Sequence, residues 1–149
     1  LGPATIPDGF TAYEGSGFSV AIPSGWPPAK QRSGVVDAKE PDSTRFLRLI
    51  TVGSTAAAFD QLSAAERQFD ADPSYGAYKR VRLERVDYRG LDAADWEFTF
   101  ILDRVPRHVL YRGIVTGGKT YVLYLSTPES RWAASKNVFQ VAADTFRTS

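Results

Sequence analysis

Four strand-like segments follow one another between residues 78 and 126 and restrict the folds open to this chain of 149 residues. They span residues 78–88, 93–102, 107–116 and 119–126. β-branched and aromatic residues are frequent in them, and short turns separate them. Consecutive strands with short connections pair with one another in antiparallel order. The stretch therefore predicts a four-stranded meander on which the remaining elements pack.

Two amphipathic segments predict helices, one before the meander and one after it. The first helix is expected to have Ser54 or Thr55 as its N-cap and to end near residue 70. The second is expected to begin with Thr127 as its N-cap and Pro128 at the first helical position. One stripe of the first helix contains Phe59, Leu62, Glu66 and Phe69, with Ala58 and Ala65 beside them, and the apolar face of the second contains Trp132, Ser135, Phe139, Ala142 and Phe146.

Three shorter strands are predicted ahead of the meander, at residues 18–22, 35–39 and 45–52. Two amphipathic helices need an apolar surface to cover, and an antiparallel sheet provides one. We therefore predict an α+β fold, an antiparallel β-sheet meander with helices packed on its faces. Residues 1–9 are expected to be a linker remnant and residues 10–149 a single domain. Because the chain has no methionine, we also expect that residue 1 is not the native start.

Composition narrows the function classes. A net charge of +1 supplies no overall field to attract nucleic acid or an anionic membrane, so neither is an expected partner. The lack of cysteine excludes disulfides, thiolate catalysis and cysteine-ligated zinc. No apolar run approaches the ~18 residues that a membrane-spanning helix needs. No residue pattern predicts a cofactor or a metal site.

Residues 113–120, GIVTGGKT, match the phosphate-loop pattern G-x-x-x-x-G-K-[ST] at every required position. A phosphate loop needs a helix directly after its lysine, because N–H groups at the helix start bind the phosphates. The residues after Thr120 are instead Tyr-Val-Leu-Tyr-Leu-Ser, which favour a strand. Gly117 and Gly118 between two strands are typical of a two-residue hairpin. We therefore predict a hairpin and no nucleotide site.

Asp95, Glu97 and His108 are the side chains of the meander with catalytic potential. Asp95 and Glu97 are one strand repeat apart, so both lie on the face opposite Trp96. Together with the single histidine they are compatible with a hydrolase, which requires all three side chains to line one cleft. We favour a structural alternative and assign no catalytic residue. In this alternative the carboxylates pair with arginines on neighbouring strands: Arg80, Arg82, Arg107 and Arg112.

Aromatic residues are assigned to the core where they alternate along a strand, as Trp96, Phe98 and Phe100 do. Trp26, in a proline-rich turn, and Trp132, early in the second helix, are compatible with two roles. Each is either a lid over the edge of the core or an aromatic side chain that faces a partner. We favour packing for both.

Residues 88–100 (YRGLDAADWEFTF), 108–118 (HVLYRGIVTGG) and 121–132 (YVLYLSTPESRW) are the most distinctive stretches of the chain. Together they resemble the C-terminal extracytoplasmic domain of actinobacterial serine/threonine protein kinases. Residues 17–26, GFSVAIPSGW, are similar to the opening of that family. The resemblance covers nearly the whole chain and implies a Mog1/PsbP-like sandwich, an antiparallel sheet between helices. This agrees with the fold predicted from the element pattern.

The resemblance implies a location and a role. In that family the domain lies outside the membrane and is joined through one membrane span to an intracellular kinase domain. We therefore expect a non-catalytic sensor whose partner is a small molecule, a cell-wall fragment or a protein, with membrane contact only through the parent chain. No kinase motif occurs in these residues, so kinase activity is expected of the parent protein and not of this domain.

For a ligand or partner surface we expect the outer face of the sheet around Asp95, Glu97 and Arg112, together with Trp26 and Trp132. A homodimer through an exposed strand edge is an alternative use of the surface. Two further functional alternatives are open. One is a stand-alone secreted or lipid-anchored carrier or assembly protein of the same fold, and the other is the hydrolase.

Overall fold

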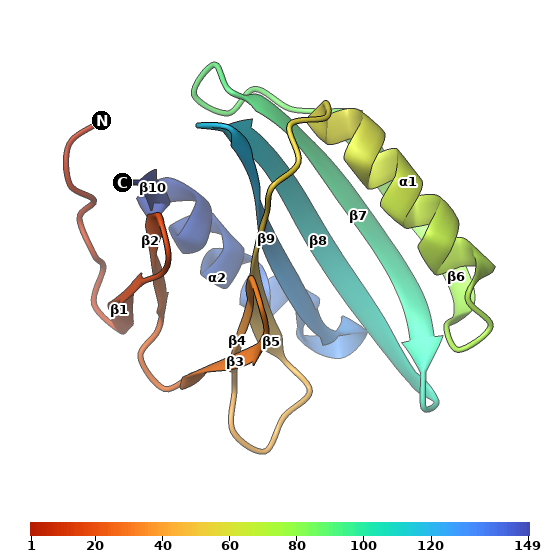
Figure 1. The fold of residues 1–149 in the computed structure, drawn as a ribbon. Helices are drawn as coiled ribbons and strands as arrows, with labels where there is room; N and C mark the ends of the chain where they lie inside the picture. Colours follow the sequence, from red (N-terminus) through yellow and green to blue (C-terminus); the bar gives the residue numbers. More distant parts are fainter.

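The computed structural model describes residues 1–149, which form two antiparallel sheets and two α-helices (Figure 1). The strands are β1 (Phe10–Glu14), β2 (Phe18–Pro23), β3 (Pro28–Arg32), β4 (Val35–Lys39), β5 (Phe46–Val52), β6 (Gly76–Arg85), β7 (Asp92–Leu102), β8 (Val105–Thr116), β9 (Lys119–Pro128) and β10 (Arg147–Thr148). The helices are α1 (Ala58–Ala71) and α2 (Trp132–Thr145), and a short 3-10 helix, η1 (Glu129–Arg131), precedes α2.

The larger sheet has seven strands in the order β3-β4-β5-β9-β8-β7-β6, and the small sheet has the order β1-β2-β10. The run from β6 to β9 is the predicted meander, in which each strand pairs with the next. α1 lies across β6, β7 and β8 on one face, whereas α2 lies on the other face against β9 and β2 (Figure 1). The predicted α+β fold is confirmed, with one helix on each face of the larger sheet.

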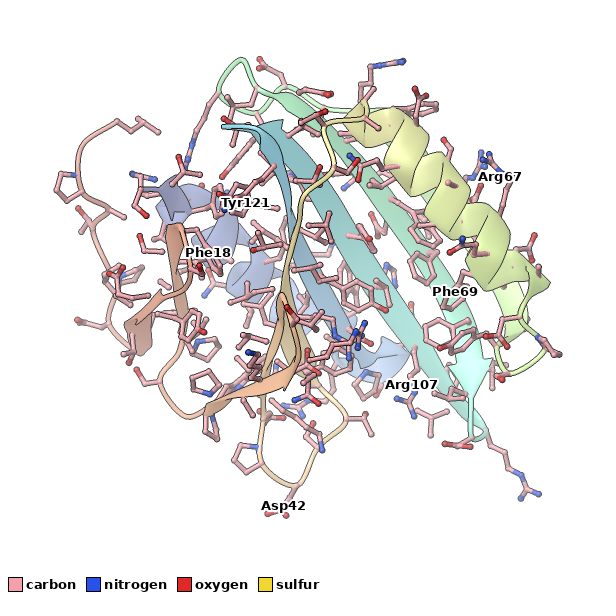
Figure 2. All side chains as sticks on the ribbon, viewed as in Figure 1. Phe18, Asp42, Arg67, Phe69, Arg107 and Tyr121 are labelled. Atoms are coloured by element: carbon pink, nitrogen blue, oxygen red, sulfur yellow. The ribbon has the colours of Figure 1, made fainter.

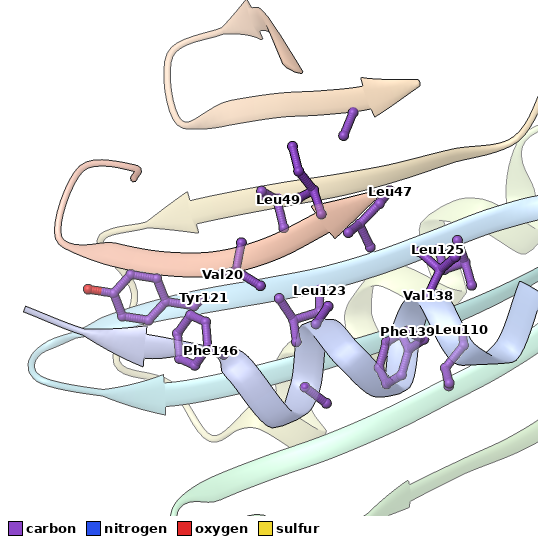
Figure 3. Packing of buried hydrophobic residues seen from close by; sticks show 14 of the residues in the cluster. Val20, Leu47, Leu49, Leu110, Tyr121, Leu123, Leu125, Val138, Phe139 and Phe146 are labelled. Atoms are coloured by element: carbon purple, nitrogen blue, oxygen red, sulfur yellow. The ribbon is translucent and has the colours of Figure 1, made fainter. Parts of the chain in front are cut away.

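The larger hydrophobic core lies between the seven-stranded sheet, α2 and the small sheet (Figure 3). Alternate residues of β5 and β9 point into it, as the period of a strand requires. Members that are at most 2% exposed include Val20, Leu47, Leu49, Leu123, Leu125 and Phe146. Each such side chain contributes about 1.5–3 kcal/mol by leaving water, so this core holds α2 and the small sheet on the larger sheet.

The smaller core lies under α1 and is mostly aromatic. Trp96, Phe98 and Phe100 project from alternate positions of β7, and Phe69 of α1 packs against all three. Ring centroids are 4.8 Å apart for Phe69 and Phe98 and 4.1 Å apart for Trp96 and Phe98. Figure 2 shows Phe69 directed toward the sheet and Arg67 directed away from it. The assignment of the β7 aromatic residues to the core is confirmed.

The predicted N-cap of α1 is wrong. The helix begins at Ala58, and no side chain of the preceding segment caps it. The Ala58 amide instead donates a hydrogen bond of 3.2 Å to Oδ2 of Asp92, at the start of β7. A carboxylate from a distant strand thus satisfies an N–H group that Ser54 or Thr55 was expected to satisfy, and its negative charge suits the helix N-terminus.

The predicted start of α2 is also wrong. Thr127 and Pro128 belong to β9, where Thr127 pairs with His108, and η1 separates them from α2. The Thr127 hydroxyl donates to the Pro128 carbonyl at 2.9 Å and caps no helix. Proline is compatible with the end of a strand as well as with the first turn of a helix, so a Thr-Pro pair does not distinguish the two.

Three strands were not predicted: β1, β3 and the two-residue β10. β3 is the edge strand of the larger sheet and is exposed at every position, so it has no alternation of apolar and polar residues. β1 is an edge strand of the small sheet. Residues 1–9 contain neither helix nor strand. The assignments of residues 1–9 as a linker remnant and of residues 10–149 as a single domain stay predictions.

Gly117 and Gly118 form the predicted hairpin between β8 and β9, and Thr116 pairs with Lys119 across it. Both glycines have positive φ, 61° and 78°, which a two-residue hairpin of this kind requires. Thr120, the last position of the phosphate-loop pattern, is buried in β9, where its hydroxyl donates to the Ser54 carbonyl at 2.7 Å. The hairpin prediction is confirmed, because the segment after Lys119 is a strand.

Candidate functional site

A network of charged side chains lies between α2 and the strands β6, β7 and β8. At its centre is Asp95, which is 0% exposed. Oδ1 of Asp95 accepts a hydrogen bond of 2.7 Å from Nε of Arg112, and Oδ2 accepts bonds of 3.0 Å from Arg112 and Arg82. The register places Arg112 directly opposite Asp95 on β8. Two guanidinium groups thus replace the hydration that a buried carboxylate loses.

Glu97 extends this network to His108. Oε1 of Glu97 accepts a bond of 3.0 Å from Arg82, and Oε2 lies 2.6 Å from Nε2 of His108. The other ring nitrogen, Nδ1, lies 2.6 Å from Oε2 of Glu129 in η1. Both ring nitrogens of His108 thus lie within hydrogen-bond distance of a carboxylate oxygen. Its ring also stacks on Trp132, with 3.9 Å between centroids and 8° between planes.

The same network attaches α2 to the sheet. The guanidinium of Arg112 lies over the rings of Tyr88 and Phe139, at 5.1 and 5.2 Å from their centroids. The Tyr88 hydroxyl donates to the Ala143 carbonyl at 2.6 Å. Arg89 donates to three carbonyl groups at the C-terminal end of α2, at 2.7–3.0 Å. These donors satisfy the carbonyl groups that a helix end leaves without partners, so they fix the position of the helix.

A second cluster surrounds Trp26 near the start of α2. Trp26 is 5% exposed, and the guanidinium of Arg45 lies 4.8 Å from its ring centroid. Arg45 also donates to Ser135 of α2 at 2.9 Å and is paired with Glu40, which accepts a further bond of 2.6 Å from Arg131. Hydrogen bonds from Arg45 and then Arg131 lower the pKa of Glu40 to about 2.

The residues predicted to form a ligand or partner surface are largely buried. Asp95, Glu97 and Arg112 come together as expected, but on the face that α2 covers. The expectation that Asp95 lies on an open outer face is therefore wrong, since it is fully buried. Strand periodicity shows which residues share a face, but it does not show which face a helix 40 residues later will cover.

The two tryptophans belong to two different clusters of side chains. Trp132 is 8% exposed and joins the charged network through His108, whereas Trp26 belongs to the Arg45 cluster. Both side chains are buried, in agreement with the packing role that we favoured. A role in ligand or partner binding for either residue stays a prediction.

The geometry argues against the hydrolase hypothesis. Asp95, Glu97 and His108 share one face, but of the three only Glu97 lines a cleft. Both oxygens of each carboxylate already accept hydrogen bonds from Arg82, Arg112 or His108. Neither carboxylate has an oxygen free to take a proton from a substrate or a water molecule. The structural alternative, cross-strand pairing with arginines, is confirmed for Arg82 and Arg112.

A small cleft of about 240 Å³ opens beside the network, between α2 and the sheet. It is lined by Arg82, Glu97, Leu110, Trp132, Lys136, Phe139 and Gln140. Sequence reasoning missed Lys136 and Gln140, which are one turn apart on α2. Polar residues at this spacing occur on the solvent-facing side of any amphipathic helix, so the sequence contains no specific signal for them.

No group of three or more histidine, cysteine, aspartate or glutamate side chains is arranged to hold a metal ion. Neither helix is long and apolar enough to cross a bilayer.

Solved structures share this architecture. PsbP of the cyanobacterium Synechocystis sp. PCC 6803 (CyanoP) matches with a TM-score of 0.75 and 21% identity, over 95% of this chain and 93% of that chain. LpqN of Mycobacterium tuberculosis, described as involved in cell envelope biogenesis, matches with a TM-score of 0.61 and 13% identity, over 94% and 91%. PA94 of Pseudomonas aeruginosa, a putative regulator, matches with a TM-score of 0.57 and 12% identity, over 91% and 94%. No curated protein matches the chain.

The antiparallel sheet with a helix on each face defines this chain as a PsbP-like α+β domain. Residues 11–148 match the family described as the serine/threonine kinase C-terminal domain, and the chain belongs to that family. The resemblance seen in the sequence is thereby confirmed. The family description names the C-terminal domain of these kinases and not their catalytic domain.

Proposed function

We propose that this chain is the non-catalytic, extracytoplasmic sensor domain of a membrane-anchored serine/threonine protein kinase. The family match over residues 11–148 is the observation that carries the proposal, because it assigns the chain to the C-terminal domain of serine/threonine kinases. The domain binds a ligand or a protein and thereby biases the activity of a kinase domain elsewhere in the parent chain.

The charged network supports a binding role over a catalytic one. Arg82, Arg112 and His108 occupy the oxygens of Asp95 and Glu97, so these carboxylates supply no general acid or base. Further contacts of Arg112 with Phe139 and of His108 with Trp132 hold α2 on the sheet, so the network and the helix form one frame. A preorganised frame suits a receptor, because less conformational entropy is lost when a ligand binds.

The extracytoplasmic location is supported by a structural neighbour. LpqN, which shares the fold, is described as involved in cell envelope biogenesis. Location is tested with an epitope tag placed after Ser149 in the full-length parent kinase. Protease added to intact cells is expected to remove this tag and to spare a second tag on the kinase domain. A tag after Ser149 that stays protected until the cells are lysed contradicts the proposal.

A stand-alone carrier or assembly protein is the second candidate function. It is favoured by the solved structures of CyanoP and LpqN, in which the fold accounts for 93% and 91% of the whole chain. An antibody raised against residues 1–149 separates the two candidates on an immunoblot of native cells. A membrane-associated band much larger than this chain supports the kinase, whereas a band of about the mass of this chain supports the carrier.

A further inference from the structure

A groove of about 410 Å³ lies between the turn that joins β1 to β2 and the turn that joins β3 to β4. We call it the Lys30–Lys119 groove after the two lysines in its lining. It shares no lining residue with the cleft beside Asp95 and Glu97. Its volume lies within the range of roughly 300–1,000 Å³ that is usual for small-molecule sites.

Strand register places both lysines on the same face of the seven-stranded sheet. Lys30 pairs with Val36, and Val36 pairs with Leu49, so all three side chains project to one side. Leu49 pairs with Leu123 of β9, and Lys119 precedes Leu123 by four residues, an even number of strand positions. Two lysines that are 89 residues apart in the chain therefore face one groove.

The lysines have no counter-charge in the protein. Every ion pair of the structure uses an arginine or His108 as its cation. No aspartate or glutamate lines the groove. Lys30 and Lys119 are both exposed, so their positive charge is available to an anion from solution.

Hydroxyl groups in the lining provide further polar partners. They belong to Tyr13 and Ser16 on one side of the groove and to Ser33 and Thr51 on the other. A carboxylate or a phosphate accepts hydrogen bonds from ammonium and hydroxyl donors, and bonds to a charged acceptor are the stronger kind. This set of donors without carboxylates matches the chemistry of an anionic head group.

The floor of the groove is apolar. Phe18, 7% exposed, and Leu49, 2% exposed, belong to both the lining and the larger core. Phe18 packs edge-on against Tyr121 with 5.8 Å between ring centroids, and the two lie together in Figure 2. Figure 3 shows the Tyr121 hydroxyl pointing away from the aliphatic side chains of this core. Phe18 and Leu49 are already buried, so the apolar surface that a ligand body can bury belongs to the half-buried Tyr13 and Val36 in the same lining.

The rim is fixed by a close backbone contact. Gly34, in the β3–β4 turn, has φ +75°, and its carbonyl accepts a hydrogen bond of 2.9 Å from the Thr51 amide. A Cβ at this position would lie 2.5 Å from the Thr51 carbonyl oxygen, so only glycine fits. Gly17 lies in the β1–β2 turn next to the lining residue Ser16, and an added Cβ there would be 4.0 Å from Nζ of Lys119. The ammonium group therefore lies beside the β1–β2 turn.

We propose that the Lys30–Lys119 groove binds a small organic anion, one with a carboxylate or phosphate head and an apolar body. The lysines and hydroxyls hold the head, and the half-buried Tyr13 and Val36 contact the body. As the ligand site of a sensor, the groove rests on the proposed function. The binding itself is a property of residues 1–149 and is tested on this chain alone.

The test is a titration of the 15N-labelled chain with octanoate, followed in two-dimensional amide spectra. Octanoate is expected to shift the signals of Ser16, Gly34 and Thr51 and to leave those of Lys136 and Gln140, in the other cleft, unchanged. Inorganic phosphate has the charge without the body, and octan-1-ol has the body without the charge. Each is expected to bind at least about 10-fold more weakly than octanoate.

Charge-removing variants assign the site. Lys30→Gln combined with Lys119→Gln is expected to weaken octanoate binding about 10-fold or more, because both charged donors are lost. Lys39→Gln is the matched control, since Lys39 is an exposed lysine of the same hairpin outside the groove, and it is expected to change affinity less than about 2-fold. Dispersed amide spectra verify that each variant is folded.

Several outcomes overturn the proposal. Octanoate binding that the double variant leaves unchanged, or shifts confined to the cleft around Lys136, refutes the site. Equal affinity for octan-1-ol refutes the role of the lysines, and equal affinity for phosphate refutes the role of the floor. Failure of the proposed function is distinguishable from these. If octanoate binds as expected but the parent protein is no extracytoplasmic kinase, the groove assignment stands and the sensor proposal fails.

Discussion

The two faces of the seven-stranded sheet are covered by helices of 14 residues each but are held by different interactions. α1 packs on aromatic rings from β7, and its one ion pair joins Glu66 to Arg80. α2 packs on a mainly aliphatic core and is attached by Arg112, Arg89 and the cluster around Glu40. Aromatic packing follows from local alternation, whereas the ion network joins residues far apart in the chain. The aromatic packing and the cross-strand pairing of Asp95 can be predicted from the sequence, but the attachment of α2 cannot.

The largest expected effect on stability comes from a substitution in the aromatic core under α1. Phe98→Ala removes a ring that is 0% exposed and touches Phe69 and Trp96. The cavity and the lost burial are expected to lower the free energy of unfolding by about 3–5 kcal/mol. Urea denaturation measures this. Ile101→Ala, at a 40% exposed position of the same strand, is the control and is expected to cost much less. A loss below about 1 kcal/mol for Phe98→Ala contradicts the role of this core.

The second largest effect is expected in the charged network around Asp95, on the face of the sheet that α2 covers. Asp95→Asn keeps the shape of the side chain but leaves Arg112 without a counter-charge and removes one of the carboxylates that pair with Arg82, so a loss of about 3 kcal/mol is expected. Denaturation at pH 7 measures it. Glu84→Gln is the matched control, because Glu84 also pairs with Arg82 but is 59% exposed, and it is expected to cost less than about 1 kcal/mol. Equal losses for the two variants refute the view that burial makes this network important.

A third test uses acid on the face that α2 covers. Because Arg45 and Arg131 lower the pKa of Glu40 to about 2, its contribution to stability is fully present above the unfolded value of about 4.3 and is lost as pH falls toward 2. Glu40→Gln is expected to flatten stability against pH in this window. Glu66, whose pKa Arg80 lowers, makes the same kind of contribution on the other face. A Glu40→Gln curve parallel to that of the wild-type chain contradicts the pairing.

The smallest expected effect appears at alkaline pH and concerns Tyr78, which packs against the aromatic core under α1. Burial, and then a hydrogen bond to Glu66, raise the pKa of Tyr78 to about 12. Its contribution is therefore present below the unfolded value of about 10 and is lost as pH rises through 12. Absorbance of tyrosinate is expected to show a group titrating near pH 12 that Tyr78→Phe removes, whereas Tyr88, Tyr111 and Tyr124, whose pKa values burial also raises, still titrate late in the variant. If that variant instead removes a group titrating near pH 10, Tyr78 is not buried as described.

The elements that could be predicted are those with a local signal. Alternation along β7 identified its core residues, and two glycines between strands identified the hairpin of a segment that matches a phosphate-loop pattern. The helix starts could not be predicted, because Asp92 caps α1 from another strand and Thr-Pro is compatible with two structures. The capping preference of a local residue does not determine where a helix starts when a distant side chain accepts the hydrogen bond from the first backbone N–H groups.

The two sites, the charged network around Asp95 and the Lys30–Lys119 groove, also differ in how far the sequence predicts them. The pairing of Asp95 with arginines across the strands was predictable from register, but its burial was not, because this depends on where α2 lies. The Lys30–Lys119 groove could not be predicted from the sequence. β3, which contains Lys30, has no apolar alternation, and the lysines meet only through the pairing of β3, β4, β5 and β9.

The central claim is that this domain regulates a kinase to which it is joined, and kinase output tests it most directly. In cells, phosphorylation of the full-length parent is compared with that of a version in which an unrelated extracytoplasmic domain replaces residues 10–149. We predict a several-fold change in phosphorylation or the loss of its response to external conditions, with kinase expression unchanged. Identical phosphorylation and an identical response in the two versions would contradict a sensor role for this domain.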